Sequence, residues 1–281
     1  SHHSDWLSLI DVSGPFLAEP VLRDVFPQGF AGLDPERRRD LRSAYDEWRE
    51  AVDLKDADLQ ALHRAWIELV LSRVLEWDAD VLKSGEAIPS ALSAARPELG
   101  IILRPDYAAA SANGDKPLCL VTVYAPDQDL GAPIKAGGWA ATPADRMVEL
   151  CRGAEVRLGL VTNGEAWMLV DAPIGGVVSF ATWYGRVWLH EPVTLQAFVD
   201  LLNVRRFHAE ESAQLPTLLA RSLEHQDEVT DALGEQVRRA IEVLIQSLDR
   251  ADLDRKRELL RGLAPRDVYE AALTVMMRIV F

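Results

Sequence analysis

The sequence is poor in cysteine and has no long apolar run. It contains two cysteines in 281 residues, and no stretch of about 18 consecutive apolar residues occurs. Cys119 and Cys151 lie in apolar contexts, which favours reduced cytosolic thiols over a disulfide framework. The missing apolar run predicts no membrane span, and the polar start SHHSDWLSL lacks the apolar core of a signal peptide. We therefore expect a cytoplasmic protein.

Positive charge is also scarce. Thirty lysines and arginines stand against 44 aspartates and glutamates, which gives a formal net charge of −14. A protein that coats DNA without specificity would be basic, so this class is disfavoured. A local basic patch remains compatible with the composition.

Several common catalytic and metal-binding patterns are missing. The six histidines show no metal-ligand spacing, and neither cysteine has a histidine nearby, so we expect no zinc site and no thiol nucleophile. No nucleophile-elbow sequence for Ser–His–Asp catalysis is present. The histidines are His2, His3, His63, His190, His208 and His225.

Apolar residues make up 48% of the chain, which is ample for a packed core. The first region, residues 1–98, is expected to be mainly helical. Asp34-Pro35 is typical of a helix start, with Asp as the cap and Pro in the first turn, and predicts a helix to about Val52. Apolar residues at helical spacing predict a second helix over 57–78.

The second region, residues 99–193, changes to strand character. Thr142, followed by Pro and Asp, predicts the start of a helix. Asn163-Gly164 between two apolar runs is a strong hairpin signal. The predicted elements are a loop at 79–98, strands at 99–108 and 118–124 joined by a loop at 111–117, a helix at 143–152, a hairpin at 157–171, and strands at 177–183 and 186–189.

The third region, residues 194–281, is helical again. Thr194 predicts the cap of a short helix to Asn203, a long helix is expected over 216–249, and another begins near Pro265. The final helix is apolar on most faces, so we expect it to be buried and the natural chain to continue. The predicted buried stripe of the long helix is Leu218, Leu219, Leu223, Val229, Leu233, Val237, Ile241 and Leu244.

One pair of strands has the layout of a PD-(D/E)xK nuclease site. Such a site needs a carboxylate at the end of one strand and a carboxylate and a lysine two residues apart on the next, where both point to one face and hold magnesium. Asp106 supplies the first carboxylate. Thr122 and Tyr124 occupy the other two positions. A hydroxyl is a poor magnesium ligand and Tyr124 carries no positive charge, so the site is expected to be degenerate and inactive.

The order of motifs in this chain resembles the N-terminal region of large restriction–modification enzymes. The similar segments are WAATPADRMVELCR, LGLVTNGEAWMLVD, ATWYGRVWLHEP and DVYEAALTVMMRIVF. The family comprises bacterial adenine methyltransferases of type IIG and their relatives in the DISARM phage-defence system, and the hairpin is also similar to that of type I restriction motor subunits. The resemblance begins near residue 60.

The resemblance implies adenine-N6 methylation of DNA with S-adenosylmethionine. This chain has neither an Asn/Asp-Pro-Pro-Tyr/Phe tetrapeptide nor a glycine-rich turn suited to the cofactor. The methyltransferase domain, and its cofactor, are therefore expected beyond residue 281, with no cofactor in this segment. Related catalytic domains use an acid on a helix before the strands, which makes Glu68 a candidate, although a solvent-facing or ion-paired side chain is the favoured alternative. Asp127 and Asp129 could host a migrated ligand, although a turn with Pro126 explains them equally well.

Candidates for DNA contact are few. Arg205, Arg206, Arg238 and Arg239 form two short basic pairs that could contact phosphates. Acids lie close to each cluster, so a solvated helix face is the alternative. Trp183, Tyr184 and Trp188 could stack on bases, but such aromatic residues more often belong to the core.

These observations predict an α/β fold, a restriction-endonuclease-like mixed sheet flanked by N-terminal and C-terminal helical regions. The leading hypothesis is a DNA-binding or assembly module of a phage-defence methyltransferase with an inactive nuclease-like core. The expected partners are duplex DNA, bound weakly and without specificity, the downstream methyltransferase domain and other defence subunits, with no membrane. One alternative is an active magnesium-dependent endonuclease with migrated ligands. The other is a scaffold that only docks proteins.

Overall fold

The computed structural model describes residues 2–111, 114 and 116–280, and the chain divides into two compact units, residues 1–223 and 224–281. The division falls inside the long helix α9. No helix among the described residues is both long and apolar enough to cross a membrane. Residues 112–113 and 115 of the predicted 111–117 loop lie outside the described part of the chain.

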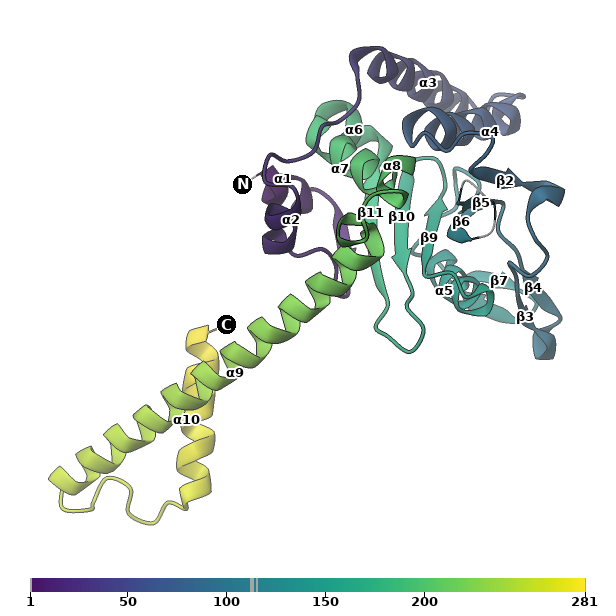
Figure 1. The fold of residues 1–281 in the computed structure, drawn as a ribbon. Coiled ribbons are helices and arrows are strands. Elements are labelled where there is room, and N and C mark those ends of the chain that lie inside the picture. The colour runs from purple at the N-terminus through teal and green to yellow at the C-terminus, as the bar shows by residue number, and fades with distance from the viewer. Residues whose placement is uncertain (1, 112–113, 115, 281) are drawn as a thin grey trace. The chain divides into compact units, whose positions relative to one another are not determined.

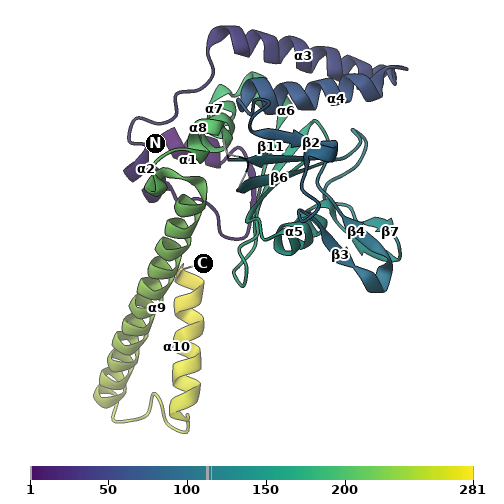
Figure 2. The ribbon, with the colours of Figure 1, turned by 45° about the vertical axis from the view of Figure 1, so that its right-hand side comes forward.

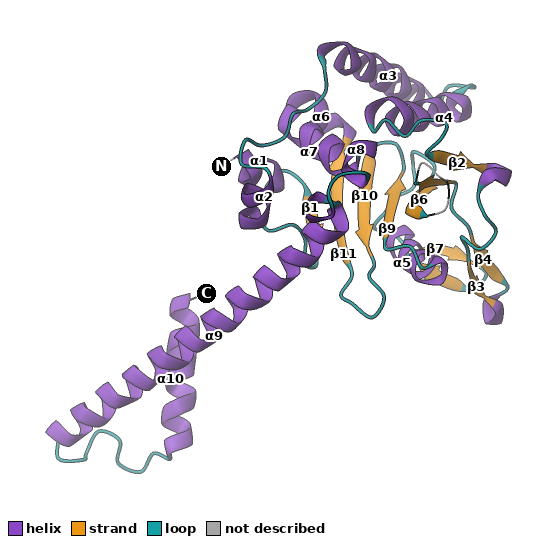
Figure 3. Ribbon diagram, viewed as in Figure 1, coloured by secondary structure: helices purple, strands orange, loops and turns teal. Residues whose placement is uncertain are grey.

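The first unit is an α/β structure built on a mixed sheet (Figures 1 and 3). Seven strands run in the order β1-β11-β10-β9-β6-β5-β2, and two further two-stranded sheets pair β3 with β4 and β7 with β8. The strands are β1 Asp11–Ser13, β2 Leu82–Ser84, β3 Ala94–Arg96, β4 Ile101–Leu103, β5 Tyr107–Ala110, β6 Pro117–Val123, β7 Ile134–Ala136, β8 Trp139–Ala141, β9 Leu158–Thr162, β10 Ala166–Asp171 and β11 Ser179–Tyr184.

Helices cover both faces of the sheet. The described α-helices of the two units are α1 His2–Leu7, α2 Glu19–Val25, α3 Pro35–Leu54, α4 Leu59–Leu69, α5 Pro143–Ala154, α6 Gly185–His190, α7 Pro192–Leu202, α8 Val204–Phe207, α9 Leu215–Asp254, which continues into the second unit, and α10 Pro265–Val280, which lies wholly in the second unit. A π-helical turn follows α4 at Val70–Val74, and 3₁₀ turns lie at Gly85–Ala87, Pro97–Leu99 and Glu211–Ala213.

Strands β6 and β9 are parallel, whereas the other paired strands of the main sheet are antiparallel. A parallel pair needs a long crossover, and α5 provides it. The capping box predicted at Thr142 starts this helix, because the Thr142 hydroxyl accepts from the Asp145 N–H and the Asp145 carboxylate accepts from the Thr142 N–H. The predicted helix and hairpin are both confirmed.

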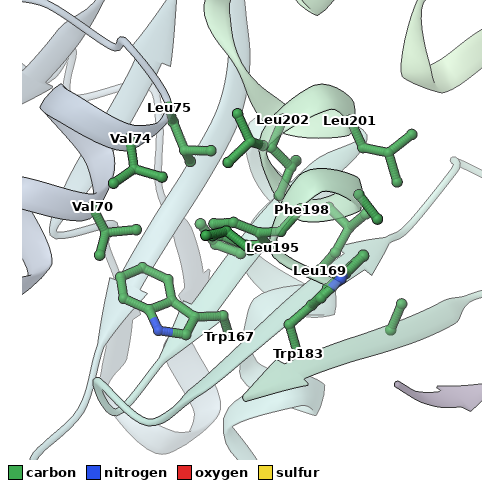
Figure 4. Packing of buried hydrophobic residues seen from close by; sticks show 14 of the residues in the cluster. Val70, Val74, Leu75, Trp167, Leu169, Trp183, Leu195, Phe198, Leu201 and Leu202 are labelled. Carbon is green, nitrogen blue, oxygen red and sulfur yellow. The ribbon is translucent and has the colours of Figure 1, made fainter. Parts of the chain in front are cut away.

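The larger core, part of which Figure 4 shows, lies on the face of the sheet opposite the smaller cluster that packs under α5. Side chains from the π-helical turn, from β10 and β11 and from α7 meet there, and the rings of Trp188 and Phe198 are 4.7 Å apart. Trp48 of α3 and Trp66 of α4 stack at 5.8 Å in the same cluster. Residues of all three regions predicted from the sequence therefore share one core.

The predicted helix over 57–78 ends early. Regular α4 stops at Leu69, the chain continues as the wider π-helical turn, and Glu76 then has a left-handed backbone conformation with φ 58°. Apolar residues crowd 69–77, and Val70, Leu71, Val74, Leu75 and Trp77 are all buried. The π-helical turn is wider than a regular helix of 3.6 residues per turn, and it carries Val70, Leu71 and Val74 into the core.

The strand predicted at 99–108 is interrupted. Ile101–Leu103 pairs with β3 in a separate small sheet, and the main sheet begins only at Tyr107. Pro105 lies between them and has no N–H for a ladder, which explains the break. Asp106 consequently precedes strand β5 instead of ending a strand. The loop predicted at 79–98 contains the short strands β2 and β3.

Two further predictions in the first unit are wrong. Residues 186–189, predicted as a strand, lie in helix α6, which buries Trp188 beside Trp167. Thr194 does not cap α7, because that helix begins at Pro192 and the Thr194 hydroxyl donates to the Glu191 carbonyl oxygen.

The second unit consists of the later part of α9 and of α10, which lie side by side in both views (Figures 1 and 2). Ile241 on α9 and Ala272 on α10 are each 2% exposed. Val229 and Leu233, predicted on the buried stripe, are 52% and 39% exposed, so the stripe is buried only in part. Helix α10 also exposes apolar residues, including Ile279 at 72%. The position after Val280 lies outside the described residues.

Candidate functional site

Two of the acids singled out in the sequence line the same cleft. Helix α4 carries Glu68, and the residue before β5 is Asp106; both border a cleft of about 520 Å³. Strand β6 contributes Val123 to it, and Tyr107 lies beside Glu68. The tertiary structure thus brings together the helix acid and the strand acid, which are 38 positions apart in the chain.

Asp106 is held by the backbone of β6. Its N–H donates to the Val121 carbonyl oxygen at 2.8 Å, and its Oδ2 accepts from the Val123 N–H at 2.7 Å. Partial burial raises the pKa of the Asp106 carboxyl, and the bond from Val123 opposes this shift. Asp106 Oδ2 therefore adds one hydrogen bond at the end of the β5–β6 pair, and this bond does not use Oδ1.

Glu68 is held by a tyrosine hydroxyl. Tyr107 Oη donates to Glu68 Oε1 at 3.1 Å across the opening of the cleft. Burial, together with the negative charge of Glu68, raises the pKa of Tyr107 to about 12. Tyr107 therefore stays protonated at neutral pH and acts as a hydrogen-bond donor.

The two degenerate positions of β6 lie on the other face of the sheet. Side chains alternate along a strand. Cys119 and Val121 belong to the core under α4, whereas Leu120 and the ring of Tyr124 pack in the cluster under α5. Thr122 falls on the α5 face by the same alternation. The β6 residue that borders the cleft with Glu68 is therefore Val123, whereas the antiparallel register that pairs Tyr107 with Val121 places Thr122 across from Asp106. The mapping of the nuclease positions onto Thr122 and Tyr124 stays a prediction.

His63 borders this cleft but both its ring nitrogens are engaged. Its Nδ1 accepts from the Trp48 indole N–H at 3.0 Å, so the proton is assigned to Nε2, which donates to the Tyr124 carbonyl oxygen at 2.8 Å. Burial lowers the pKa of His63. The neutral ring thus links α3, α4 and the end of β6, which is a structural role.

A second, larger cleft adjoins the first. Its volume is about 1050 Å³, and it shares Gln60, His63 and Val123 with the acid-lined cleft. Its apolar lining includes Val52 and Leu59. No sequence pattern indicated this cleft, because it depends on how the α3–α4 connection meets the segment after β6.

The remaining acidic candidates are in turns. Asp127 lies in the turn after Pro126 and borders the larger cleft, while Asp129 Oδ1 accepts from the Gly131 N–H at 2.8 Å. Across residues 2–111, 114 and 116–280, no group of three or more His, Cys, Asp or Glu side chains is placed to hold a metal ion.

Each arginine proposed for DNA contact has a partner within the protein. Arg206 donates to the carbonyl oxygens of Asp200 and Ala213 and stacks on Phe26 at 4.4 Å, so it has a structural role. Arg205 is 68% exposed and pairs with Glu76. In the second unit, Arg238 and Arg239 are 62% and 73% exposed and both pair with Glu235. Phosphate contact by these three exposed arginines stays a prediction.

The aromatic and thiol candidates are in the core. Trp183 is fully buried and Trp188 is 2% exposed, so their rings are core residues and are closed to bases. Tyr184 is half-buried and donates to Asp11 Oδ2 at 2.5 Å. Cys119 and Cys151 are buried free thiols; burial raises both pKa values, that of Cys151 to about 12. Neither sulfur is therefore ionised at neutral pH.

Comparisons with protein-family models, with curated proteins and with solved structures find no match to this chain.

Proposed function

We propose that this chain is a catalytically inactive, nuclease-like module of a larger adenine-specific DNA methyltransferase of phage defence, and that it serves DNA binding or assembly in the cytoplasm. The observation that carries the proposal is the cleft at β5 and β6. Glu68 and Asp106 both line this cleft, which supports a nuclease-like origin, and strand β6 contributes Val123 to the same lining.

The arrangement of the strands supports the nuclease-like half of this proposal. Strands β5 and β6 are adjacent and antiparallel, with Tyr107 opposite Val121. Asp106 therefore lies across from the end of β6, where the second carboxylate and the lysine of a PD-(D/E)xK site would be. The sequence resemblance supplies the methyltransferase context, together with S-adenosylmethionine as the cofactor of the complete enzyme.

The chemistry of the side chains supports inactivity. Magnesium is bound by oxygen ligands, and phosphodiester hydrolysis needs the ion to stabilise charge and to activate water. Valine has no ligand atom and no charge. The other face of β6 supplies no metal-binding carboxylate and no lysine either, because the residues there are Thr122 and Tyr124.

Plasmid nicking tests the inactive core. We expect no conversion of supercoiled plasmid to nicked or linear DNA with either Mg²⁺ or Mn²⁺. Asp106→Asn is compared with Asp46→Asn, which changes an exposed acid on α3 outside the cleft. Nicking by the wild-type chain that disappears only in Asp106→Asn would overturn the proposal and favour the endonuclease with migrated ligands.

Weak DNA binding is tested separately. The net charge of −14 repels phosphate at long range, so affinity must come from exposed arginines. We expect non-specific affinity for duplex DNA of roughly 10⁻⁴–10⁻⁶ M at physiological salt. Replacing Arg205, Arg238 and Arg239 by Ala should flatten the salt slope by up to about 0.9 for each phosphate that an arginine no longer neutralises. An absence of binding at low salt would remove DNA from the proposal and leave assembly.

A further inference from the structure

The two clefts form one groove in the first unit. They share Gln60, His63 and Val123, and we call the combined surface the α4–β6 groove. Its two halves differ in chemistry. The larger half combines apolar groups with the charged residues Arg49, Asp53, Lys55 and Asp127. The smaller half is bordered by the carboxylates of Glu68 and Asp106 and by Arg64. An occupant of the whole groove therefore needs an apolar part and a part that suits two acids.

The two acids form no ion pair among the described residues. Glu68 Oε1 accepts from Tyr107, and Asp106 Oδ2 accepts from the Val123 N–H. Neither carboxylate forms an ion pair within 4.0 Å, although Arg64 lines the same half of the groove. Partial burial raises the pKa of the Asp106 carboxyl, and the hydrogen bond from the Val123 N–H opposes this shift. A guanidinium or ammonium group from outside would compensate the charge of the carboxylates and could form charge-assisted hydrogen bonds.

The larger half suits an apolar side chain. Val52, Leu59 and Pro126 are among its lining residues, and none of the three is fully buried. Arg49 and Asp53 also line this half, and they already form an ion pair with each other at 2.7 Å. Covering these apolar groups would contribute about 25 cal/mol for each Å² removed from water.

These features favour a polypeptide over a nucleic acid. Lys55 and Arg64 also line the groove, but phosphate groups would still face the carboxylates of Glu68, Asp106 and Asp127 on a protein whose net charge is already −14. A basic segment would instead be attracted by the same charge, which speeds association. Arginine is also among the residues that contribute most to protein interfaces, because its guanidinium combines charge with a flat apolar surface.

We propose that the α4–β6 groove binds a segment of a partner protein that places one arginine or lysine side chain between Glu68 and Asp106 and a nearby apolar side chain over the Val52 half. This inference deepens the assembly role proposed above by naming the surface and the chemistry of its partner. It rests on the proposed function only for that role, since the groove itself is independent of the methyltransferase context.

A short peptide serves as the probe. Acetyl-Leu-Gly-Arg-Gly-Leu-amide presents one guanidinium flanked by two apolar side chains, and the same peptide with citrulline in place of arginine keeps the shape without the charge. The peptides are titrated into the ¹⁵N-labelled chain in buffer with EDTA, and the Trp48 indole N–H signal is followed. This group donates to His63, which borders both halves of the groove.

The matched variants test the acids. Glu68→Gln with Asp106→Asn removes both charges but keeps oxygen acceptors for Tyr107 and for the Val123 N–H, so the fold should be retained. Asp46→Asn with Glu47→Gln removes two exposed acids of α3 outside the groove. We expect the arginine peptide to bind the groove variant roughly tenfold more weakly than the wild type, with a similar loss for citrulline. The α3 control should change the affinity less than twofold.

Three results would overturn the inference. One is the absence of any shift of the Trp48 signal at millimolar peptide. Another is binding that is equal for arginine and citrulline, or equal for the wild type and the groove variant. The third is a shift of the same signal by duplex DNA that becomes larger when the two acids are neutralised, which would assign the groove to nucleic acid. Plasmid nicking would contradict the inactive core without deciding the peptide result, so the two proposals fail separately.

Discussion

Replacing His63 by Phe should destabilise the first unit in a way that depends on pH. The imidazole joins the Trp48 indole N–H to the Tyr124 carbonyl oxygen. Trp48 is 1% exposed, so its N–H would lose its acceptor with no access to water. An unsatisfied buried donor costs about 1–3 kcal/mol, and the loss of the bond to Tyr124 adds about 0.5–1.5 kcal/mol. We expect a decrease of about 2–4 kcal/mol in the free energy of unfolding at pH 7.5.

The pH dependence follows from the lowered pKa of His63, which burial causes. An unfolded histidine has a pKa of about 6.5, so between this value and the lower folded pKa the unfolded chain binds more protons. The contribution of His63 is complete above about pH 6.5 and declines as the pH falls, by at most about 1.4 kcal/mol per pH unit. Protonation of His63 would also place a proton on Nδ1. Nδ1 could then no longer accept the hydrogen bond from the Trp48 indole N–H. The difference between wild type and His63→Phe should therefore shrink below pH 6.5.

Urea unfolding followed by tryptophan fluorescence measures this difference between pH 5.5 and 7.5. All eight tryptophans lie in residues 1–223, so the signal reports the first unit. His190→Gln, at an exposed position, serves as the control and should leave the pH profile unchanged. A wild-type-minus-variant difference that stays constant across this range, or grows toward acid, would refute the assignment of a buried neutral His63.

Three other changes should have distinct effects. Gly164→Ala should cost at least about 1–3 kcal/mol in urea unfolding, because Gly164 has φ +92° and a methyl group would lie 2.5 Å from the Trp48 ring; an unchanged midpoint would contradict this. Thr142→Ala should cost about 0.5–2 kcal/mol by removing the cap of α5, and Thr142→Ser should restore most of it. Deleting 266–281 should expose the face around Ile241 and promote aggregation in light scattering; a monomer with an unchanged melting temperature would show that this packing is dispensable.

The sequence by itself determined those elements whose signals are local. Asp34 accepts from the N–H groups of Glu36 and Arg37, as its place before Pro35 predicts. The turn at Asn163 forms because its side chain accepts from the next backbone N–H groups and Gly164 adopts a positive φ. Caps and tight turns are decided within about four residues, so they can be predicted without knowing the fold.

The tertiary structure decided features in which a distant contact outweighs the local pattern. Helix α6 replaced a predicted strand because Trp188 packs on Phe198, and Arg206, which looked like a solvent-facing basic residue, is held by distant carbonyl groups and the ring of Phe26. The sequence also left open which face of β6 meets α4, since side-chain alternation defines two faces but not which one meets a given helix.

The candidate site shows the same division. The sequence identified Glu68 and Asp106 as acids of interest, but not that they share a cleft and form no ion pair among the described residues. The adjoining apolar half of the α4–β6 groove could not be foreseen either. Residue types fix which chemistry a chain can offer, whereas the packing of α4 against the end of β6 fixes which groups face one another and which remain uncompensated.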